Sequence, residues 1–398
     1  MISTDVLIVG GGPAGLAAAL ALRQQGAGVT VLDAQRPPID KACGEGLMPN
    51  ARRALAQLGV PLDAGEGSLL RGLRFAHHQH HALTDVASAA FPSTESGIGL
   101  RRQSLHAHLV HAAREAGISL LWNTPAQLLP GQRILVNGAP VRYRWLIGAD
   151  GQNSRVRRWS GLEAGITLSR RFGFRRHYAV EPWSPYVEVH WAESGQAYVT
   201  PVSATEVCVA AITRDPHCRL NTLLQELPWL RHKLRAARPV EQPLDAERGA
   251  ITTTRHLRSV ARGCIALIGD ASGSVDAITG EGMALAFHQA HLLAECLSTG
   301  NEHDDLERYN DLHPEILRLP RTMACALLLM DRFPKLRARA LHLFAAEPAL
   351  FTRLLQVHLG AESLSSFLLA QGGHFALRLA MPPSYASTSP VSFEEERA

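Results

Sequence analysis

The stretch that decides the fold reads DVLIVGGGPAGLAAAL, at residues 5–20. The aliphatic run at residues 5–9 predicts a strand buried on both faces, and the alanine- and leucine-rich run after the glycines predicts a helix. Gly10 permits the tight turn between them, Gly12 lets a pyrophosphate approach the backbone, and Gly15 lets the helix pack against the strand. Because a helix N-terminus carries unpaired N–H groups and a partial positive charge, this turn is expected to bind phosphate.

A second strand at residues 29–32 completes a βαβ unit and closes on Asp33, 18 residues after Gly15. A carboxylate at this place accepts hydrogen bonds from the hydroxyl groups of a ribose. The unit therefore predicts a dinucleotide, although it does not separate NAD from FAD. The residues that we expect to contact it here are Gly10, Gly12, Pro13, Ala14, Gly15, Asp33 and Ala34.

The length and composition of the chain exclude several classes of protein. At roughly 150 residues per domain, a chain of 398 residues has room for two or three domains. The net charge is +4, and 37 of the 40 cationic residues are arginines spread without a basic block, so no nucleic-acid partner is expected. A hydrophobic share of 46% with 19% charged residues excludes a disordered chain.

The cysteines and the apolar runs indicate a cytoplasmic protein. The six cysteines include no Cys-x-x-Cys pair, so neither a zinc site nor a disulfide is expected. The longest apolar run near the C-terminus, at residues 323–330, has eight residues, whereas a helix needs about 20 to cross a bilayer. The apolar N-terminus lacks a basic region and is interrupted by glycines, so it does not read as a signal peptide.

Downstream, the pattern changes from buried strands to alternation. Between residues 172 and 212, polar and apolar side chains alternate around Tyr186 and Tyr198, which indicates antiparallel strands in a second layer. The last third of the chain is expected to be helical. Further strands are expected at residues 143–148 and 264–268, and further helices at residues 100–116, 222–238 and 282–297.

Three segments narrow the cofactor to FAD. LIGADG at residues 146–151, continued by QNSRVR, resembles the Asp-Gly motif of flavoprotein hydroxylases, and ALIGDA at residues 266–271 resembles their Gly-Asp motif. LRRQSL at residues 100–105 resembles the segment whose arginine reaches the FAD phosphates, with Arg102 in that place rather than Arg101. The chain thus resembles the para-hydroxybenzoate hydroxylase superfamily over at least residues 1–300. The resemblance implies non-covalent FAD with further contacts at Arg102, Asp150, Asp270, Gly280, Gly282 and Met283.

The expected fold class is α/β: a Rossmann-type FAD-binding domain with a parallel sheet, a substrate domain with an antiparallel sheet, and a helical C-terminal region. We expect a discontinuous FAD-binding domain at residues 1–75, 96–165 and 250–310, a substrate domain at 76–95 and 166–249, a helical region at 311–380, and a disordered tail at 381–398.

Two loops resemble the geranylgeranyl reductase branch of the superfamily more than its aromatic hydroxylases. They are TGEG at residues 279–282 and KACGEGL at residues 41–47, which contains Cys43. None of the six tryptophans has another two positions away, so the Trp-x-Trp-x-Ile-Pro signature of flavin halogenases is absent. No second glycine fingerprint exists, so NADH or NADPH is expected to bind transiently as the reductant.

The sequence leaves two chemistries open. Monooxygenation of a hydrophobic aromatic or polyketide-like molecule is favoured, because the superfamily contains more hydroxylases. The alternative is reduction of a carbon–carbon double bond in a prenyl substrate, for which Cys43 is the candidate proton donor. A flavin halogenase and a non-catalytic flavin-binding module are the remaining hypotheses, and a monomer or a dimer is expected.

Four further features of the sequence also carry expectations. The histidines at 77–81 are expected at an exposed hairpin tip rather than in a metal site, and Lys41 as a solvated loop residue. The run at residues 336–359 is expected to form an amphipathic helix pair, with peripheral membrane contact as a lesser alternative. The candidates to line the substrate site are His190, Trp191, Tyr198, Thr200 and Pro201.

Overall fold

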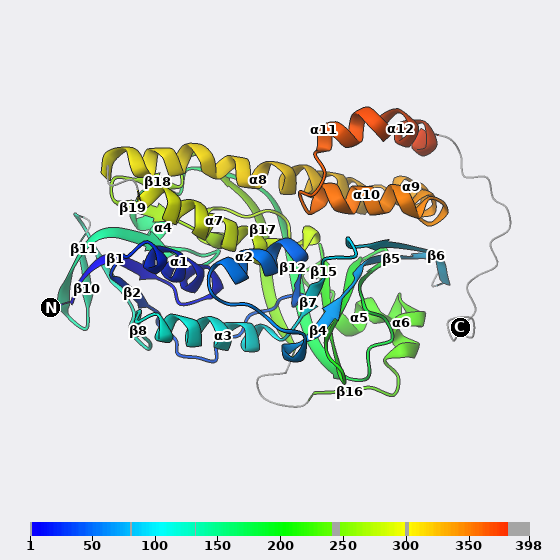
Figure 1. Cartoon of the computed structure of the whole chain (residues 1–398). Coiled ribbons are helices and arrows are strands. Elements are labelled where there is room, and N and C mark those ends of the chain that lie inside the picture. Colours follow the sequence, from blue (N-terminus) through cyan, green and yellow to red (C-terminus); the bar gives the residue numbers. More distant parts are fainter. Residues whose placement is uncertain (1, 80–81, 132, 241–246, 299–301, 381–398) are drawn as a thin grey trace.

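The computed structural model describes residues 2–79, 82–131, 133–240, 247–298 and 302–380. Two sheet-based halves lie side by side, and one long helix, α8 (Glu302–Arg332), runs along both of them (Figure 1). This arrangement confirms the expected fold class, with a parallel sheet, an antiparallel sheet and a helical C-terminal region.

The first half is built on a parallel sheet. Its main path runs β18 (Ala261–Arg262), β19 (Ile265–Leu267), β11 (Ala139–Gly148), β1 (Ile2–Val9), β2 (Val29–Leu32) and β8 (Ser119–Leu121). The five strands from β19 to β8 are mutually parallel, and β18 is antiparallel to β19.

Both faces of this sheet are covered at its centre, which explains why residues 6–8 of β1 and all of β2 and β19 are buried. Val6 and Ile8 pack into the helix-covered core, whereas Leu7 packs into the core on the opposite face. The first face carries α1 (Pro13–Gln24), α2 (Pro49–Gln57), α3 (Arg102–Glu115) and α7 (Gly282–Leu297). The second carries β9 (Gln127–Leu129), β10 (Arg133–Val136) and α4 (Arg155–Trp159).

The second half is built on an antiparallel sheet, as the alternation predicts. Its path runs β16 (Arg238–Pro239), β12 (Gly165–Ala179), β15 (Glu206–Thr213), β14 (Gly195–Ser203), β13 (Tyr186–Trp191), β5 (Gly72–Gln79) and β6 (Ala82–Ala90). β17 (Arg248–Leu257) pairs with β12, and β13 and β5 form the one parallel pair among the described strands of this sheet. A small sheet of β3 (Gly46–Leu47), β7 (Gly97–Gly99) and β4 (Ser68–Leu70) contacts β14.

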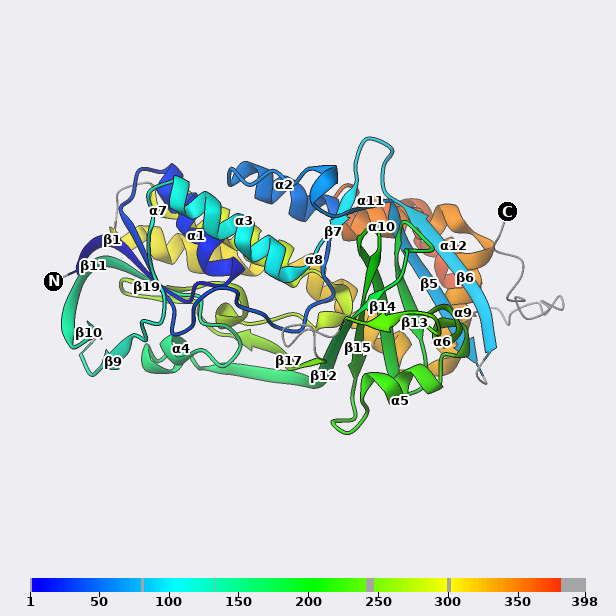
Figure 2. The same cartoon turned by 90° about the horizontal axis from the view of Figure 1, so that it is seen from below.

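Helices cover both faces of the second sheet (Figures 1 and 2). The expected helix at residues 222–238 is instead two short helices, because Pro228 begins the second of them. The expected pair at residues 336–359 is confirmed on the other face. The helices are α5 (Leu220–Gln225) and α6 (Pro228–Lys233) on one face, and α9 (Pro334–Ala346) and α10 (Pro348–His358) on the other.

The short elements complete the described chain. They are the 3-10 helices η1 (Ala64–Glu66), η2 (Gly269–Ser272) and η3 (Ala277–Thr279), then α11 (Leu364–Phe367), the π-helix η4 (Leu368–Gly372) and α12 (Gly373–Ala380). Among the described residues, no helix combines the length and the apolar character that a bilayer span requires.

The exposed hairpin tip expected for the histidine run is wrong for its first two members. His77 and His78 lie in β5 with buried side chains, because helices cover both faces of the sheet there. His78 Nε2 lies 3.0 Å from His190 Nδ1, and burial lowers the pKa of His78 to about 2. His80, His81 and the tail at residues 381–398 lie outside the described residues.

Candidate functional site

A cavity of about 1240 Å³ begins at the carboxyl edge of the parallel sheet. Gly10, Asp33, Asp150 and Asp270 each follow closely on a different strand, namely β1, β2, β11 and β19. Because carboxyl ends of parallel strands meet at one edge of a sheet, these residues come together although the sequence separates them. All four line the cavity.

The three fingerprint glycines meet different steric demands. Gly10 has a φ of +116°, and a Cβ there would overlap the carbonyl of Ala149. A Cβ on Gly15 would overlap the carbonyl oxygen of Gly10, so Gly15 alone of the three lies behind the cavity wall. A Cβ on Gly12 would meet no atom within 4 Å. Only Gly12 therefore faces open space, which is where a pyrophosphate needs room.

Asp33 lies at the end of β2 and lines the cavity, as predicted. Its carboxylate accepts hydrogen bonds from the backbone N–H of Gly11 (2.7 Å) and of Gln35 (2.8 Å). These bonds hold the side chain against the glycine turn. Ribose recognition by its remaining lone pairs stays a prediction.

Asp150 lines the cavity, and its carboxylate also accepts hydrogen bonds from the start of α4. Its carboxylate accepts hydrogen bonds from the backbone N–H groups of Arg155 (2.7 Å) and Val156 (3.1 Å) and from the hydroxyl of Ser154. The side chain thus caps the N-terminus of α4, which stabilises the start of a helix.

Arg157 belongs to the segment that continues the Asp-Gly motif, and its role becomes clear only in the structure. Its side chain is fully buried and donates to the carbonyls of Gln152 (2.8 Å) and Ala271 (3.0 Å). Its Nε also pairs with Glu163 at 2.7 Å. Arg157 therefore ties the Asp-Gly motif to the Gly-Asp motif, more than 100 residues further along the chain.

The Gly-Asp carboxylate is paired with a lysine. Lys41 is exposed, as expected of a solvated loop residue, but its Nζ also lies 2.8 Å from Asp270. Burial raises the pKa of Asp270, but Lys41 and then Arg102 outweigh it and hold the pKa below its ordinary value. Asp270 therefore stays ionised on the wall of the cavity.

Arg102 and Arg101 point to different places. Arg101 forms a bidentate ion pair with Glu206, at 2.7 and 2.6 Å. Arg102 lines the cavity, and its buried Nε has no hydrogen-bond partner among the described residues. This unsatisfied donor, the open space at Gly12 and the carboxylate of Asp33 fit the charged and ribosyl parts of FAD.

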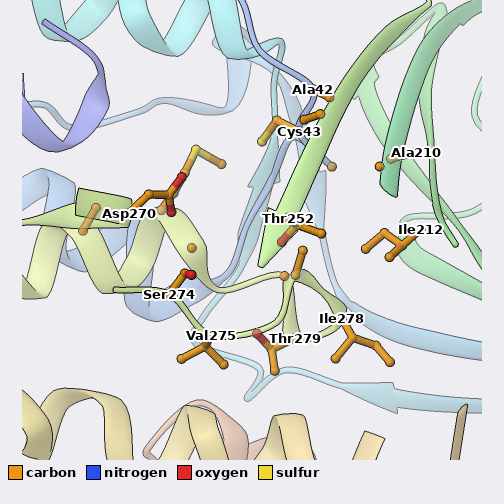
Figure 3. A pocket seen from close by; sticks show the side chains of 18 of the residues that line it. Ala42, Cys43, Ala210, Ile212, Thr252, Asp270, Ser274, Val275, Ile278 and Thr279 are labelled. Carbon is orange, nitrogen blue, oxygen red and sulfur yellow. The ribbon is translucent and has the colours of Figure 1, made fainter. Parts of the chain in front are cut away.

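Cys43 lines the cavity; in the view of Figure 3, Thr252 lies between Cys43 and Thr279, and Ile212 of the second sheet lies to one side. Burial raises the pKa of the Cys43 thiol, although the nearby Arg102 opposes the shift. The thiol is therefore protonated at neutral pH, as a proton donor must be. The rest of the predicted contacts, Pro13, Ala14, Ala34, Gly280, Gly282 and Met283, also line this cavity.

A buried polar network that the sequence did not reveal holds the Cys43 loop. Glu45 has a left-handed backbone, with a φ of 60°, and its carboxylate lies 2.6 Å from His177 Nε2. It also accepts from the backbone N–H of Arg102 at 3.0 Å. Beside it, Arg175 contacts His177 at 2.8 Å and pairs with Asp40 at 2.6 Å. The loop, the start of α3 and β12 are thus locked together under the cavity.

The second sheet supplies the other wall of the cavity. Tyr198 and Thr200 line it, as predicted, whereas His190, Trp191 and Pro201 do not. β13 turns its valines toward the cavity, so His190 lies on the opposite face beside Glu188, at 3.2 Å. The valines are Val187 and Val189.

The cavity continues along this wall as an apolar arm that is lined by residues from all the helices from α8 to α12. Thr322 and His358 are the polar residues that the described parts of these helices contribute to it, and they contribute no charged Lys, Arg, Asp or Glu. The large apolar residues of the arm are Met323, Leu327, Leu329, Met330, Leu336, Phe344, Phe351, Leu354, Leu355, Leu364, Phe367, Leu368, Phe375 and Leu379.

Sequence relatives cover most of the chain. A menaquinone reductase of Mycobacterium tuberculosis is 29% identical over 84% of this chain and 85% of the relative. Digeranylgeranylglycerophospholipid reductase 1 of Methanopyrus kandleri is 27% identical over 83% of this chain and 91% of the relative. Hispidin-3-hydroxylase of Neonothopanus nambi is 31% identical, over 48% of this chain and 47% of the relative.

Comparison of the structure supports the same fold. A flavoprotein/dehydrogenase from Cytophaga hutchinsonii superimposes with a TM-score of 0.77 at 15% identity, covering 94% of this chain and 98% of that one. The family model described as "FAD binding domain" matches residues 3–311. The chain therefore belongs to the FAD-binding domain family and is an FAD-dependent oxidoreductase of the para-hydroxybenzoate hydroxylase superfamily, with relatives in its geranylgeranyl reductase-like branch.

Proposed function

We propose that this oxidoreductase reduces a carbon–carbon double bond in a long, isoprenoid-like hydrophobic substrate, with NADH or NADPH as the transient electron donor. The observation that carries the proposal is the apolar arm of the cavity. It leads from the Cys43 loop to α12, and a compact aromatic substrate would leave most of it unfilled.

The sequence by itself favours hydroxylation, but the shape of the site and the relatives favour reduction. A chain of isoprene units has no polar groups to satisfy, so a wall of leucine, methionine and phenylalanine binds it by removing apolar surface from water. The reductases reported above are named for a menaquinone and a digeranylgeranyl lipid, and both compounds carry isoprenoid chains.

Reduction of an alkene breaks the π bond and forms two C–H bonds, one from a hydride and one from a proton. When bound and reduced by NADH or NADPH, FAD would supply the hydride. Cys43 supplies the proton: its thiol is buried, protonated at neutral pH and placed on the wall of the cavity. The resulting thiolate takes up a proton from solvent before the next turnover.

The test is turnover of isoprenoid and phenolic substrates with NADH or NADPH under strict anaerobiosis. We expect an isoprenoid product heavier by two hydrogen atoms, formed at full rate without oxygen. A product that gains an oxygen atom, formed only in air, would contradict the proposal and establish hydroxylation instead.

A cysteine variant identifies the proton donor. Cys43→Ser should slow alkene reduction by about 10²-fold or more, the usual contribution of a general acid, while flavin reduction by NADH or NADPH continues. Cys325→Ser is the matched control, because Cys325 is an exposed free cysteine outside the cavity. Because the pKa of Cys43 is raised above 9.0, the wild-type rate should stay level through neutral pH and fall only in more alkaline buffer.

A further inference from the structure

The C-terminal helical segment carries an exposed apolar face, which we name the outer face. Leu369 is 91% exposed and Leu377 is 59% exposed, eight residues apart along η4 and α12. The other exposed residues of the outer face are small and uncharged: Ala370, Gly373, Ala376 and Ala380. Figure 1 shows α11 and α12 as the outermost layer, above α9 and α10.

The two basic residues of α12, His374 and Arg378, are both paired with an acidic residue. His374 Nε2 lies 2.7 Å from Glu347, and Arg378 Nε lies 2.9 Å from the same carboxylate. Both side chains therefore form ion pairs with the residue that directly precedes α10. A contiguous exposed apolar surface of this kind usually marks a contact with a membrane or another protein.

The opposite side of the same segment lines the cavity. Phe367, Phe375 and Leu379 contribute to the apolar arm, so the segment is apolar on its inner and its outer side. Leu368 belongs to both, because it lines the cavity and is 53% exposed. On α8, Leu329 also lines the cavity while being half exposed. The apolar arm thus reaches the surface between apolar side chains.

We propose that the outer face and the rim of the cavity, Leu329 and Leu368, dock on a lipid bilayer, from which the substrate enters the apolar arm. The identity of the entering molecule rests on the proposed function. A long isoprenoid chain resides in the bilayer, since each CH₂ group moved into water costs about 0.8 kcal/mol. If the leucine rim of the cavity contacts the lipid, the isoprenoid can move from the bilayer into the apolar arm without crossing water.

Charge near the rim favours an anionic membrane. Phe333 is exposed one turn after Leu329, and the exposed cations Arg332 and Lys335 flank it. Basic residues beside an inserted aromatic ring are attracted to anionic headgroups. A lipid surface supplies anionic headgroups for these cations, whereas a contact between two copies of the chain would have to supply an acidic partner for each of them.

The first test is co-sedimentation of the FAD-loaded protein with vesicles of phosphatidylcholine, with and without phosphatidylglycerol. Wild type should sediment with the vesicles, more completely when phosphatidylglycerol is present. The double variant Leu369→Glu/Leu377→Glu should bind at least about tenfold more weakly, because it lacks the two exposed leucines whose side chains would enter the lipid. Leu168→Glu is the matched control: Leu168 is 58% exposed on β12 and lies outside the cavity.

Equal sedimentation of the double variant and wild type, or no sedimentation of wild type, would overturn the proposal. So would a wild-type dimer that dissociates in the double variant without vesicle binding, because the outer face would then be a contact between copies. Unchanged flavin content and thermal midpoint establish that the double variant is folded.

The second test separates docking from the reaction. A long isoprenoid presented in vesicles and a short, water-soluble isoprenol are supplied to both proteins under anaerobiosis. Docking predicts that the double variant loses turnover of the vesicle substrate but keeps turnover of the short one. Equal turnover of both substrates by both proteins would overturn docking. If neither protein reduces either substrate while vesicle binding is as expected, the proposed function fails and docking stands.

Discussion

At the scale of single residues, Asp33 shows how one carboxylate serves the fold and the ligand together. It receives the N–H of Gly11 at 2.7 Å and faces the cavity. Asp33→Ala should raise the dissociation constant of FAD at least about tenfold, because a hydrogen bond to a charged group contributes about 1.5–3 kcal/mol. The measurement is the ratio of flavin to protein absorbance after extensive dialysis.

The control for this substitution is Asp311→Ala, since Asp311 is exposed on α8 and lies outside the cavity. Full flavin retention in Asp33→Ala would assign ribose recognition to another group. Loss of flavin in the control as well would show that the assay reports general destabilisation.

At the scale of elements, the β1–α1 turn allows folding and binding to be separated by two similar substitutions. Gly15→Ala should destabilise even the flavin-free protein, because its Cβ would overlap the carbonyl oxygen of Gly10 and push α1 off the strand. Gly12→Ala should leave the flavin-free protein as stable as wild type, since its Cβ meets no atom within 4 Å, but weaken FAD binding.

Thermal unfolding of the flavin-free proteins and titration with FAD measure the two effects. Overpacking of this kind usually costs about 1–3 kcal/mol. The interpretation fails if Gly12→Ala unfolds earlier than Gly15→Ala, or if it binds FAD as tightly as wild type.

At the scale of the whole molecule, α8 runs along both halves and is fixed to the first half by a buried histidine. His313 Nε2 lies 3.0 Å from the hydroxyl of Ser272, next to the Gly-Asp motif, and burial lowers the pKa of His313 from 6.5 to about 4. Below pH 6.5 the unfolded chain binds a proton that the folded protein does not. The free energy of unfolding should therefore fall as the pH falls from 6.5 toward 4, and this contribution is fully present at higher pH.

His313→Gln should flatten this acid dependence by up to about 3 kcal/mol. Urea unfolding between pH 7 and pH 4 measures it, with His217→Gln as the control because His217 is exposed. The same slope in wild type and His313→Gln would show that other groups govern the loss of stability in acid.

The sequence by itself predicted the FAD-binding half and most of the residues that line its cavity. Gly15 is required because its Cβ would overlap the carbonyl oxygen of Gly10 in the same turn, and Asp33 and Asp270 follow strands that apolar runs identify. Such features are local, so a single chain displays them. The second sheet was predicted as antiparallel for the same reason, since alternation is a property of adjacent residues.

Only the tertiary structure decided what depends on distant segments. Glu45 meets His177 across 132 positions of sequence, and alternation alone cannot say that the valines of β13, rather than His190, face the cavity. The histidines of β5 were misjudged because the helices that bury them come from elsewhere in the chain. The apolar arm likewise exists only where α8 to α12 pack together, because a cavity is made of the space between elements and no single segment encodes it.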